Sequence, residues 1–223
     1  MIVQHDHFLD LAGMLKQIQG FYLQFETEES AKRKSALVDI IHSLNNDGIE
    51  GTALISGSLS MGMSVRTEEE DSDIDLLFAG QTSRFLNHYE IHNMFYDEIY
   101  KQLGYNVKID FSVPFDIEFI KLSLSEFQAA SYDYIGKFYA KYKSWQPVTD
   151  SLLPLVERLD ELRQQNFVFD QYLKTSALHG FHWERSFGKY HERLLQRGIS
   201  IPDEESIREK VFIEMYYLCY GDS

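Results

Sequence analysis

Along the first half of the chain, apolar residues recur at spacings that alternate between helical and extended. Residues 5–24 and 27–44 carry large apolar side chains three or four positions apart, which predicts two amphipathic helices. The second helix starts at a threonine, a residue type that caps helix N-termini, and ends at a run of Asn, Asp and Gly over 45–48. Residues 52–56 are apolar and stop at a Gly-Ser pair, which predicts a buried strand that runs into a tight turn.

The middle of the chain predicts further strands separated by a helix. Residues 73–78 form a second short strand, and residues 82–103 carry apolar side chains at helical spacing. Over 105–113 apolar and polar residues alternate, which is typical of a strand with one buried face. We expect a fourth strand at 117–122, before a capping-box pattern of Ser and Glu at 123–126 opens another helix.

From residue 123 onward the pattern is helical. Amphipathic segments cover 123–143, 151–165, 169–196 and 203–220, with interruptions marked by proline and glycine. The change of periodicity predicts one domain over residues 1–123 and a helical domain over residues 124–223. The expected fold class is therefore α+β, with N-terminal helices, a small mixed sheet and a C-terminal helical bundle.

Composition indicates a folded chain and narrows the class of partner. The 223 residues are 44% hydrophobic and 25% charged and include only four prolines, which argues against disorder. Lys and Arg total 21 against 35 Asp and Glu, so the formal net charge is −14 at pH 7. This balance disfavours a sequence-independent grip on nucleic-acid phosphates and fits a small, cationic or protein partner better.

The sequence also predicts a compartment. Cys219 is the only cysteine, so neither an intrachain disulfide nor a site with several thiolate ligands is expected. The first residues lack the basic start and apolar run of a signal peptide, and no window holds eighteen uncharged apolar residues. We therefore expect a cytoplasmic protein without a membrane partner.

The residues that suggest chemistry are three aspartates on two predicted strands. Asp73 and Asp75 are two positions apart on one strand, so their side chains share a face. Asp110 lies on the polar face of another strand. Carboxylates held side by side repel one another, and Mg²⁺ prefers a few carboxylate oxygens together with substrate phosphates. If the two strands are neighbours, the three aspartates predict a metal site.

Three carboxylates are enough to hold two cations about 3.5 to 4 Å apart, the spacing that clamps the attacking and leaving oxygens of a phosphoryl displacement. Gly57, at the end of the first predicted strand, permits close approach of the backbone to a ligand. Ser58 beside it offers a hydroxyl and an amide to a phosphate. The reaction class that this set favours is nucleotidyl transfer.

Over about residues 51–113 this set resembles the nucleotidyltransferase superfamily, which includes DNA polymerase beta, antibiotic nucleotidyltransferases and the minimal nucleotidyltransferases of toxin–antitoxin loci. The matching residues are Gly57-Ser58, Asp73-Ile74-Asp75 and Asp110. The resemblance implies a nucleotidyltransferase core in which these aspartates bind Mg²⁺ or Mn²⁺. It also implies that an acceptor hydroxyl attacks the α-phosphate of a nucleoside triphosphate, with ATP as the expected donor, and releases pyrophosphate.

Two features depart from the superfamily pattern. Ser58 precedes Asp73 by fifteen positions, more than is usual, and the excess is the acidic run from Glu68 to Asp71. That run either faces solvent or restrains the empty pocket. Some relatives use a separate Glu as general base, and here either Glu118 or Asp110 itself is available for that role.

Several basic residues are candidates for binding the nucleotide. Arg66 and Lys108 lie near the aspartates in sequence, where they either contact a phosphate or only balance the carboxylate charge. Lys137 and Lys141 are four positions apart on a predicted helix, where they either receive the outer phosphates or form a solvated face. The four tyrosines nearby are expected to pack mainly in the core; they are Tyr132, Tyr134, Tyr139 and Tyr142.

Later in the chain, Arg185 and His191 lie on one predicted helix and resemble the Arg and His motif of helical ribonucleases. The motif is permissive in a chain with eight histidines, so a ribonuclease role is a minor alternative. His182 and Trp183 are expected to pack in the core.

The leading interpretation is a metal-dependent nucleotidyltransferase, expected to be an adenylyltransferase, that acts on a hydroxyl of a small molecule or protein. One alternative is a toxin-type enzyme that modifies a protein or transfer RNA. Another is a catalytically inactive interaction protein that retains the fold, which the acidic run favours and the intact aspartates oppose. The sequence leaves the nucleotide, the acceptor and the oligomeric state open.

Overall fold

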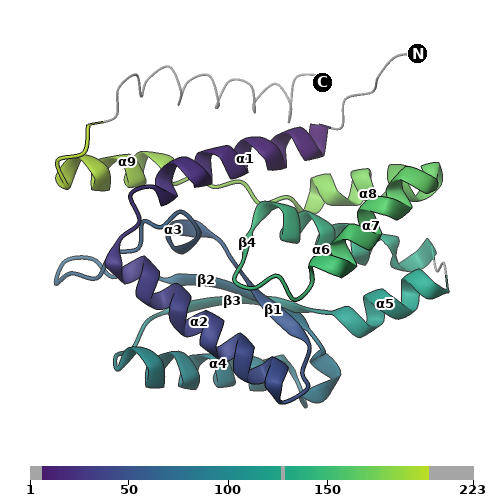
Figure 1. Ribbon diagram of the computed structural model, residues 1–223, viewed down its shortest axis with the longest axis horizontal. Helices are drawn as coiled ribbons and strands as arrows, with labels where there is room; N and C mark the ends of the chain where they lie inside the picture. The colour runs from purple at the N-terminus through teal and green to yellow at the C-terminus, as the bar shows by residue number, and fades with distance from the viewer. Residues whose placement is uncertain (1–6, 127–128, 201–223) are drawn as a thin grey trace.

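A computed structural model describes residues 7–126 and 129–200 of the chain (Figure 1). The helix expected over 203–220, which contains Cys219, lies outside the described residues. Within them, no helix is both long enough and apolar enough to cross a lipid bilayer.

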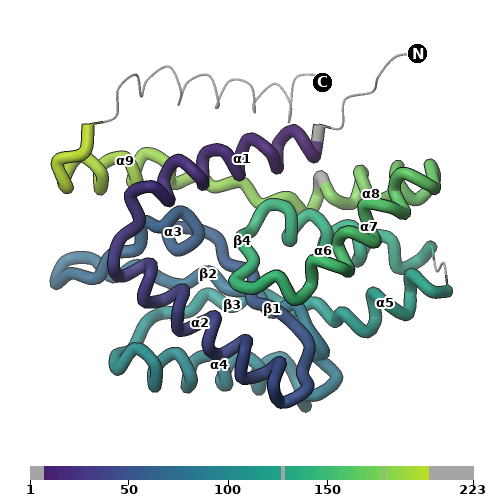
Figure 2. Tube along the Cα trace, in the orientation of Figure 1, coloured from purple at the N-terminus to yellow at the C-terminus, as the bar shows by residue number. Residues whose placement is uncertain are grey.

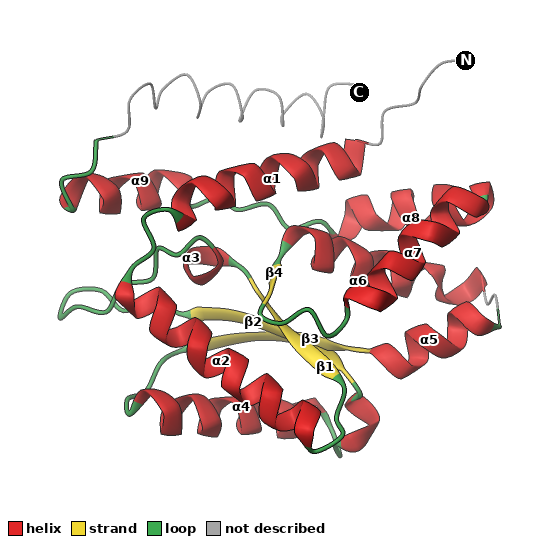
Figure 3. Ribbon diagram, viewed as in Figure 1, coloured by secondary structure: helices red, strands yellow, loops and turns green. Residues whose placement is uncertain are grey.

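The fold is α+β, with one small mixed sheet among helices (Figure 3). The strand order is β3-β2-β1-β4. β2 pairs antiparallel with β1 and parallel with β3, while β4 pairs antiparallel with β1. The strands are β1 (Gly51–Ile55), β2 (Ile74–Gly80), β3 (Ile109–Asp116) and β4 (Gln146–Pro147).

The two faces of the sheet are covered by different helices. One face packs on α2 (Glu28–Asn46) and α4 (His88–Leu103), in a core that includes Ile55, Leu76 and Phe78. The other face, which carries Leu54 and Leu77, packs on three helices in one continuous core. These helices are α6 (Tyr132–Ser144), α7 (Leu153–Gln165) and α8 (Phe167–Gly180). Alternation along β1 and β2 thus builds a core on each side of the sheet.

A third core joins the two ends of the described chain. α1 (His7–Leu23) lies beside α9 (Phe187–Gln196) along one side of the molecule (Figures 1 and 2). Tyr22 packs edge to face against Tyr190, with ring centroids 5.8 Å apart. Met61 and Met63, which follow the short helix α3 (Gly57–Ser60), complete this cluster. The contact brings α9 next to the turn after β1.

The structure corrects the prediction for residues 117–126. The segment expected as a strand is α5 (Ile117–Ser125), and Ser123 is buried inside it rather than at its start. The helix is capped by Asp116, whose Oδ1 accepts from the backbone N–H groups of Glu118 and Phe119. Ile117 and Ile120 are both fully buried at helical spacing. A short apolar run does not distinguish a strand from a buried helix, which explains the error.

Two further elements differ from the expectation. The third strand begins at Ile109 rather than at 105, and the two-residue strand β4 was not predicted. The helix expected over 169–196 is divided into α8 and α9 by residues 181–186, which are not helical; we call them the strap. Since β4 belongs to the sheet and follows residue 124, the sheet draws on both predicted domains, and the domain boundary stays a prediction.

The tyrosines of α6 pack as expected. Tyr132, Tyr139 and Tyr142 are buried in the core beside α7 and α8. Tyr134 packs against Phe115, with ring centroids 5.1 Å apart, and its hydroxyl accepts from a backbone N–H. None of these four rings lines either of the cavities described below.

Candidate active site

The two aspartates of the Asp-x-Asp motif lie at the start of β2. Asp73 directly precedes the strand and Asp75 is its second residue. Ile74 and Leu76, which point the other way, are fully buried against α2 and α4. Asp110 is the register partner of Asp75 on the parallel strand β3. The structure therefore brings the three predicted carboxylates together at one end of the β2–β3 pair.

The carboxylate of Asp75 is held in an environment that disfavours its charge. Burial raises the pKa of Asp75 to about 6, and the negative charges of Asp73 and Asp110 act in the same direction. Glu184 adds to this effect, whereas Lys108 opposes it. An ionised carboxylate here needs a compensating cation, and oxygen ligands of this type are those that Mg²⁺ and Mn²⁺ prefer. The chemistry of these donors, though not their present arrangement, thus suits the metal that the sequence predicts.

Lys108 supplies part of that compensation. Its Nζ donates to Asp110 Oδ2 at 2.9 Å and to Asp73 Oδ2 at 3.4 Å, and these hydrogen bonds raise the pKa of the ammonium group. The side chains of all three residues are at least 43% exposed, so this bridge exchanges readily with solvent. Within the described ranges, no three acidic, histidine or cysteine side chains are arranged to hold one metal ion. The ammonium group of Lys108 thus partly neutralises Asp73 and Asp110, two of the carboxylates that the sequence predicts to bind the metal.

Gly57 lies against Asp75, a contact that the sequence did not predict. Its φ is +61°, and a Cβ added there would overlap the Oδ2 atom of Asp75. Ser58 is half-buried next to it, and its Oγ lies 3.3 Å from Ser64 Oγ. Only glycine at position 57 lets the first strand end directly beneath the carboxylate.

The acidic run is partly anchored to helices. Glu70 pairs with Lys189 and Arg193 of α9, each at 2.5 Å. Asp71 pairs with Arg33 of α2 at 2.7 Å. The other two acidic residues of the run are exposed. The extra residues between Ser58 and Asp73 thus form a loop that α2 and α9 hold in place.

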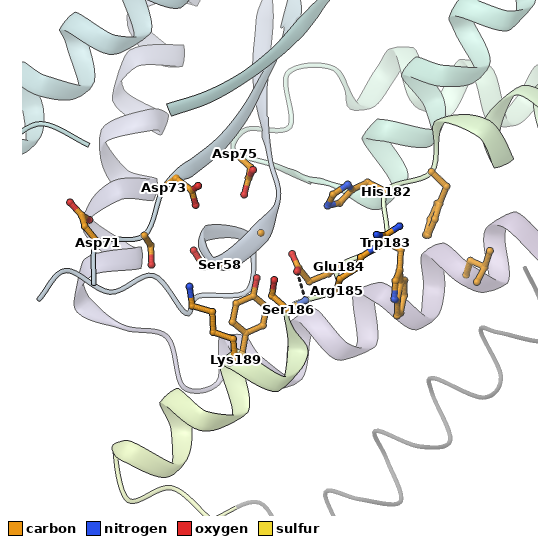
Figure 4. A pocket seen from close by; sticks show the side chains of 15 residues that line it. Ser58, Asp71, Asp73, Asp75, His182, Trp183, Glu184, Arg185, Ser186 and Lys189 are labelled. Carbon is orange, nitrogen blue, oxygen red and sulfur yellow. Dashed lines mark hydrogen bonds between the residues drawn. The ribbon is translucent and has the colours of Figure 1, made fainter. Parts of the chain in front are cut away.

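Two cavities share Asp75 in their walls. The first, which we call the Gly57 cavity, has a volume of about 700 Å³ (Figure 4). The second, the Asp110 cavity, has a volume of about 850 Å³. Asp75 and His182 line both cavities. The Gly57 cavity is also lined by Ser58, Asp73, Glu184, Arg185 and Lys189, and the Asp110 cavity by His88, His92, Ser112, Lys141 and Trp145.

The predicted basic residues divide between the site and the surface. Lys141 lines the Asp110 cavity, and its Nζ lies 4.6 Å from the centre of the Trp145 ring. Lys137 instead donates to Asp133 at 2.7 Å on the exposed face of α6. Arg66 stacks on a tyrosine ring at 3.6 Å, and neither Arg66 nor Lys137 lines either cavity. The structure therefore separates the two lysines that the sequence paired.

Four residues at the site were not predicted from the sequence. Lys189 comes from the first turn of α9, and the strap contributes His182, Glu184 and Arg185 to the lining of the Gly57 cavity (Figure 4). Glu184 is only 6% exposed and accepts from the backbone N–H of Ser186 at 2.7 Å. The available signal was the loss of helical periodicity after position 180, which coincides with a cluster of polar and aromatic residues.

The structure also shows where the residues of two minor hypotheses lie, the ribonuclease-like Arg and His pair and the candidate base Glu118. Arg185 lies in the strap and His191 is buried in α9, so the single helix expected to carry both is wrong. Glu118, one candidate base, is exposed on α5, where it accepts from Gln81 Nε2 at 3.2 Å. Glu118 lines neither cavity.

The chain was compared with protein-family models, with curated proteins and with solved structures. None of the three comparisons gives a match.

Proposed function

We propose that the protein is a metal-dependent nucleotidyltransferase with a nucleotidyltransferase core. It transfers a nucleoside monophosphate from a nucleoside triphosphate, with ATP as the expected donor, to a hydroxyl group. The observation that carries the proposal is the pairing of Asp75 with Asp110 in register, beside Asp73 and against the backbone of Gly57.

In this proposal the three aspartates hold Mg²⁺ or Mn²⁺. The bound metal would neutralise the triphosphate and the charge that develops on the leaving oxygen. The raised pKa of Asp75 supports this assignment, because burial first and the neighbouring carboxylates second disfavour its charge, which a bound cation would offset. Lys108 would leave the carboxylates as the metal binds and would then be free to contact a phosphate.

The triphosphate would occupy the Gly57 cavity. Ser58 offers a hydroxyl there, and two cations line the same wall, Arg185 and Lys189. Lys189 is held by Glu70 at 2.5 Å, so the phosphate would compete with that carboxylate for the ammonium group. These two cations take the role in phosphate binding that the sequence suggested for Lys137 and Lys141.

The acceptor would occupy the Asp110 cavity. This cavity shares Asp75 with the Gly57 cavity, so an acceptor hydroxyl bound there approaches the α-phosphate from the opposite side. Its histidines, serine and tryptophan suit a neutral, hydroxyl-bearing molecule or a protein side chain. A transfer RNA remains the alternative acceptor of the same enzyme class.

The test is to incubate the full chain with Mg²⁺ and each nucleoside triphosphate labelled at the α-phosphate, with a cell extract as the source of acceptor. We expect label to move to one acceptor class with wild-type protein and not with Asp73→Asn, while the exposed control Asp97→Asn retains transfer. Nuclease, protease and filtration steps then separate a nucleic acid, a protein and a small molecule. Equal labelling by Asp73→Asn would refute the assignment of the site.

One observation favours the second candidate, an inactive interaction protein. Lys108 satisfies Asp73 and Asp110 without a metal, as it would in a fold that has lost catalysis. Calorimetry with ATP and Mg²⁺ separates the two candidates. Binding that needs the metal and is lost in Asp75→Asn supports the enzyme, and no binding at millimolar Mg²⁺ supports the inactive protein.

A further inference from the structure

His182 occupies the wall between the two cavities. It belongs to the strap between α8 and α9, and it is the only residue besides Asp75 that lines both the Gly57 and the Asp110 cavity in the part of the chain that the structure describes. We propose that His182 is the general base that accepts the proton of the attacking hydroxyl. This inference rests on the proposed nucleotidyl transfer and assigns the catalytic base to a residue other than Glu118 and Asp110, the two that the sequence offered.

The ring of His182 is held in place while its nitrogens stay available. The backbone N–H of His182 donates to Ser144 Oγ at 3.4 Å, which ties the strap to the end of α6. The imidazole packs edge to face on Trp145, with ring centroids 5.4 Å apart and an interplanar angle of 70°. No described residue forms a hydrogen bond with either ring nitrogen. The imidazole is therefore oriented by packing and free to bond a substrate.

The surroundings of His182 keep the ring uncharged. Burial lowers the pKa of His182, and the positive charges of Lys141 on α6 and Arg185 on the strap lower it further. Glu184 on the strap acts in the opposite direction, and Asp75 on β2 shares both cavities with the ring. Since a lowered pKa leaves imidazole neutral near pH 7, the ring can accept a proton there.

The neighbour of His182 in the Asp110 cavity, Trp145, carries a polar atom without a partner among the described residues. Trp145 is 3% exposed and lines the Asp110 cavity, yet its Nε1–H has no hydrogen-bond acceptor among the described residues. A buried indole N–H normally finds a partner. The atom itself is buried, so a molecule in the cavity would reach it only after neighbouring side chains shift.

The other candidate bases are less well placed. Asp110 already accepts from Lys108 and is proposed to hold the metal. Glu118 lies away from both cavities, and Glu184 lines only the Gly57 cavity. Among these candidate bases, His182 is the one that lines both cavities.

The proposed step is a displacement at the α-phosphorus. The acceptor oxygen forms a bond to the α-phosphorus of the nucleoside triphosphate, and the bond from that phosphorus to the bridging oxygen of pyrophosphate breaks. The proton of the acceptor hydroxyl moves to a ring nitrogen of His182 and returns to solvent after pyrophosphate leaves. No oxidant, reductant or further reactant is needed.

The experiment measures pyrophosphate release from ATP and Mg²⁺, with water or concentrated glycerol as the attacking hydroxyl. The full chain is compared with His182→Gln, with His182→Ala and with the control His42→Gln, whose side chain is exposed on α2. We expect kcat of both His182 variants to fall about 100-fold, the usual contribution of a general base. Calorimetry should find their affinity for ATP and Mg²⁺ within twofold of wild type. Imidazoles of increasing pKa should restore the rate of His182→Ala in proportion to their basicity.

Each result supports or overturns the inference. Retained kcat in His182→Gln, lost ATP affinity in both variants, or no rescue of His182→Ala by any imidazole overturns the assignment of His182 and leaves the proposed function intact. Wild-type protein that neither binds ATP with Mg²⁺ nor releases pyrophosphate overturns the proposed function itself.

Discussion

At the level of single residues, the contact between Gly57 and Asp75 constrains both positions. The glycine has a positive φ, and its Cα faces the carboxylate oxygen that the proposed metal would use. The positive φ and the close contact with Asp75 therefore each favour glycine at position 57. Substitutions at the two positions test these reasons separately.

Gly57→Ala should lower both stability and transfer activity. A left-handed conformation costs an alanine about 1–2 kcal/mol, and the overlap of its Cβ with Asp75 Oδ2 adds to that cost and displaces the carboxylate. Gly48→Ala is the matched control, because Gly48 has φ +78° and no atom near the added Cβ. Urea unfolding of both variants isolates the contribution of the overlap. Equal losses of stability, with activity retained in Gly57→Ala, would show that the close contact is unimportant.

Asp75→Asn should stabilise the metal-free protein in a pH-dependent way. The folded pKa of about 6 exceeds the ordinary value of 3.8, so the folded protein holds this proton longer than the unfolded chain does. Wild type therefore loses stability relative to Asp75→Asn as the pH rises from about 4 to about 6, and the gap is constant above that range. Thermal melts of both proteins across this range measure it. Addition of Mg²⁺ should reduce the gap by stabilising wild type only.

At the level of elements, two arginines hold the acidic loop. Arg33 of α2 is fully buried and bonds Asp71 and the backbone carbonyl of Ser72. Arg193 of α9 is 5% exposed and bonds Glu70 and the carbonyl of Met63. The loop joins the turn after β1 to the start of β2. Arg33 and Arg193 therefore fix the segment of this loop that leads into Asp73.

Arg193→Met should destabilise the fold by about 1–3 kcal/mol, since it leaves the buried carbonyl of Met63 without its donor, while Glu70 keeps its pair with Lys189. Hydrogen exchange in the loop over 63–72 should rise at the same time. Arg158→Met is the control, because Arg158 forms only an exposed pair with Glu161 and its loss should cost less than about 1 kcal/mol. A loop that exchanges no faster in Arg193→Met than in wild type would contradict the anchoring role.

For the whole molecule, the site is assembled from segments distant in the sequence. β2 and β3 supply the aspartates, while the strap and α9 supply the facing wall of the Gly57 cavity. α9 reaches that position because it packs on α1 and on Met61 and Met63. Nucleotide binding should therefore depend on the ion pair between Glu70 and Lys189 at this junction.

Lys189→Ala should weaken the binding of ATP with Mg²⁺ about tenfold, the value of one charge-assisted hydrogen bond. Glu70→Gln should strengthen it, because the carboxylate no longer competes with phosphate for Lys189. Calorimetry on both variants gives these affinities, with the exposed Lys101→Ala on α4 as the control. Opposite shifts support the competition. A loss of affinity in Glu70→Gln would show instead that the ion pair positions the lysine.

The sequence by itself determined those features that depend on residues close together in the chain, such as the face of a strand on which a side chain lies. Alternation placed Asp73 and Asp75 on one face and Asp110 on the polar face of its strand, because side chains in a strand follow a period of two. The glycine before Ser58 likewise marked the end of the first strand. Local periodicity did not separate strand from helix over 117–125, where the buried face and the Asp116 cap decided for the helix.

Only the tertiary structure decided which distant groups meet. The parallel register of β2 and β3 set Asp75 opposite Asp110, and the strap brought His182 to Asp75 across more than a hundred residues of chain. Lys137 and Lys141 look equivalent in the sequence, yet one faces solvent and the other a cavity. Such pairings follow from long-range packing of the sheet and helices, which no local pattern of residues encodes.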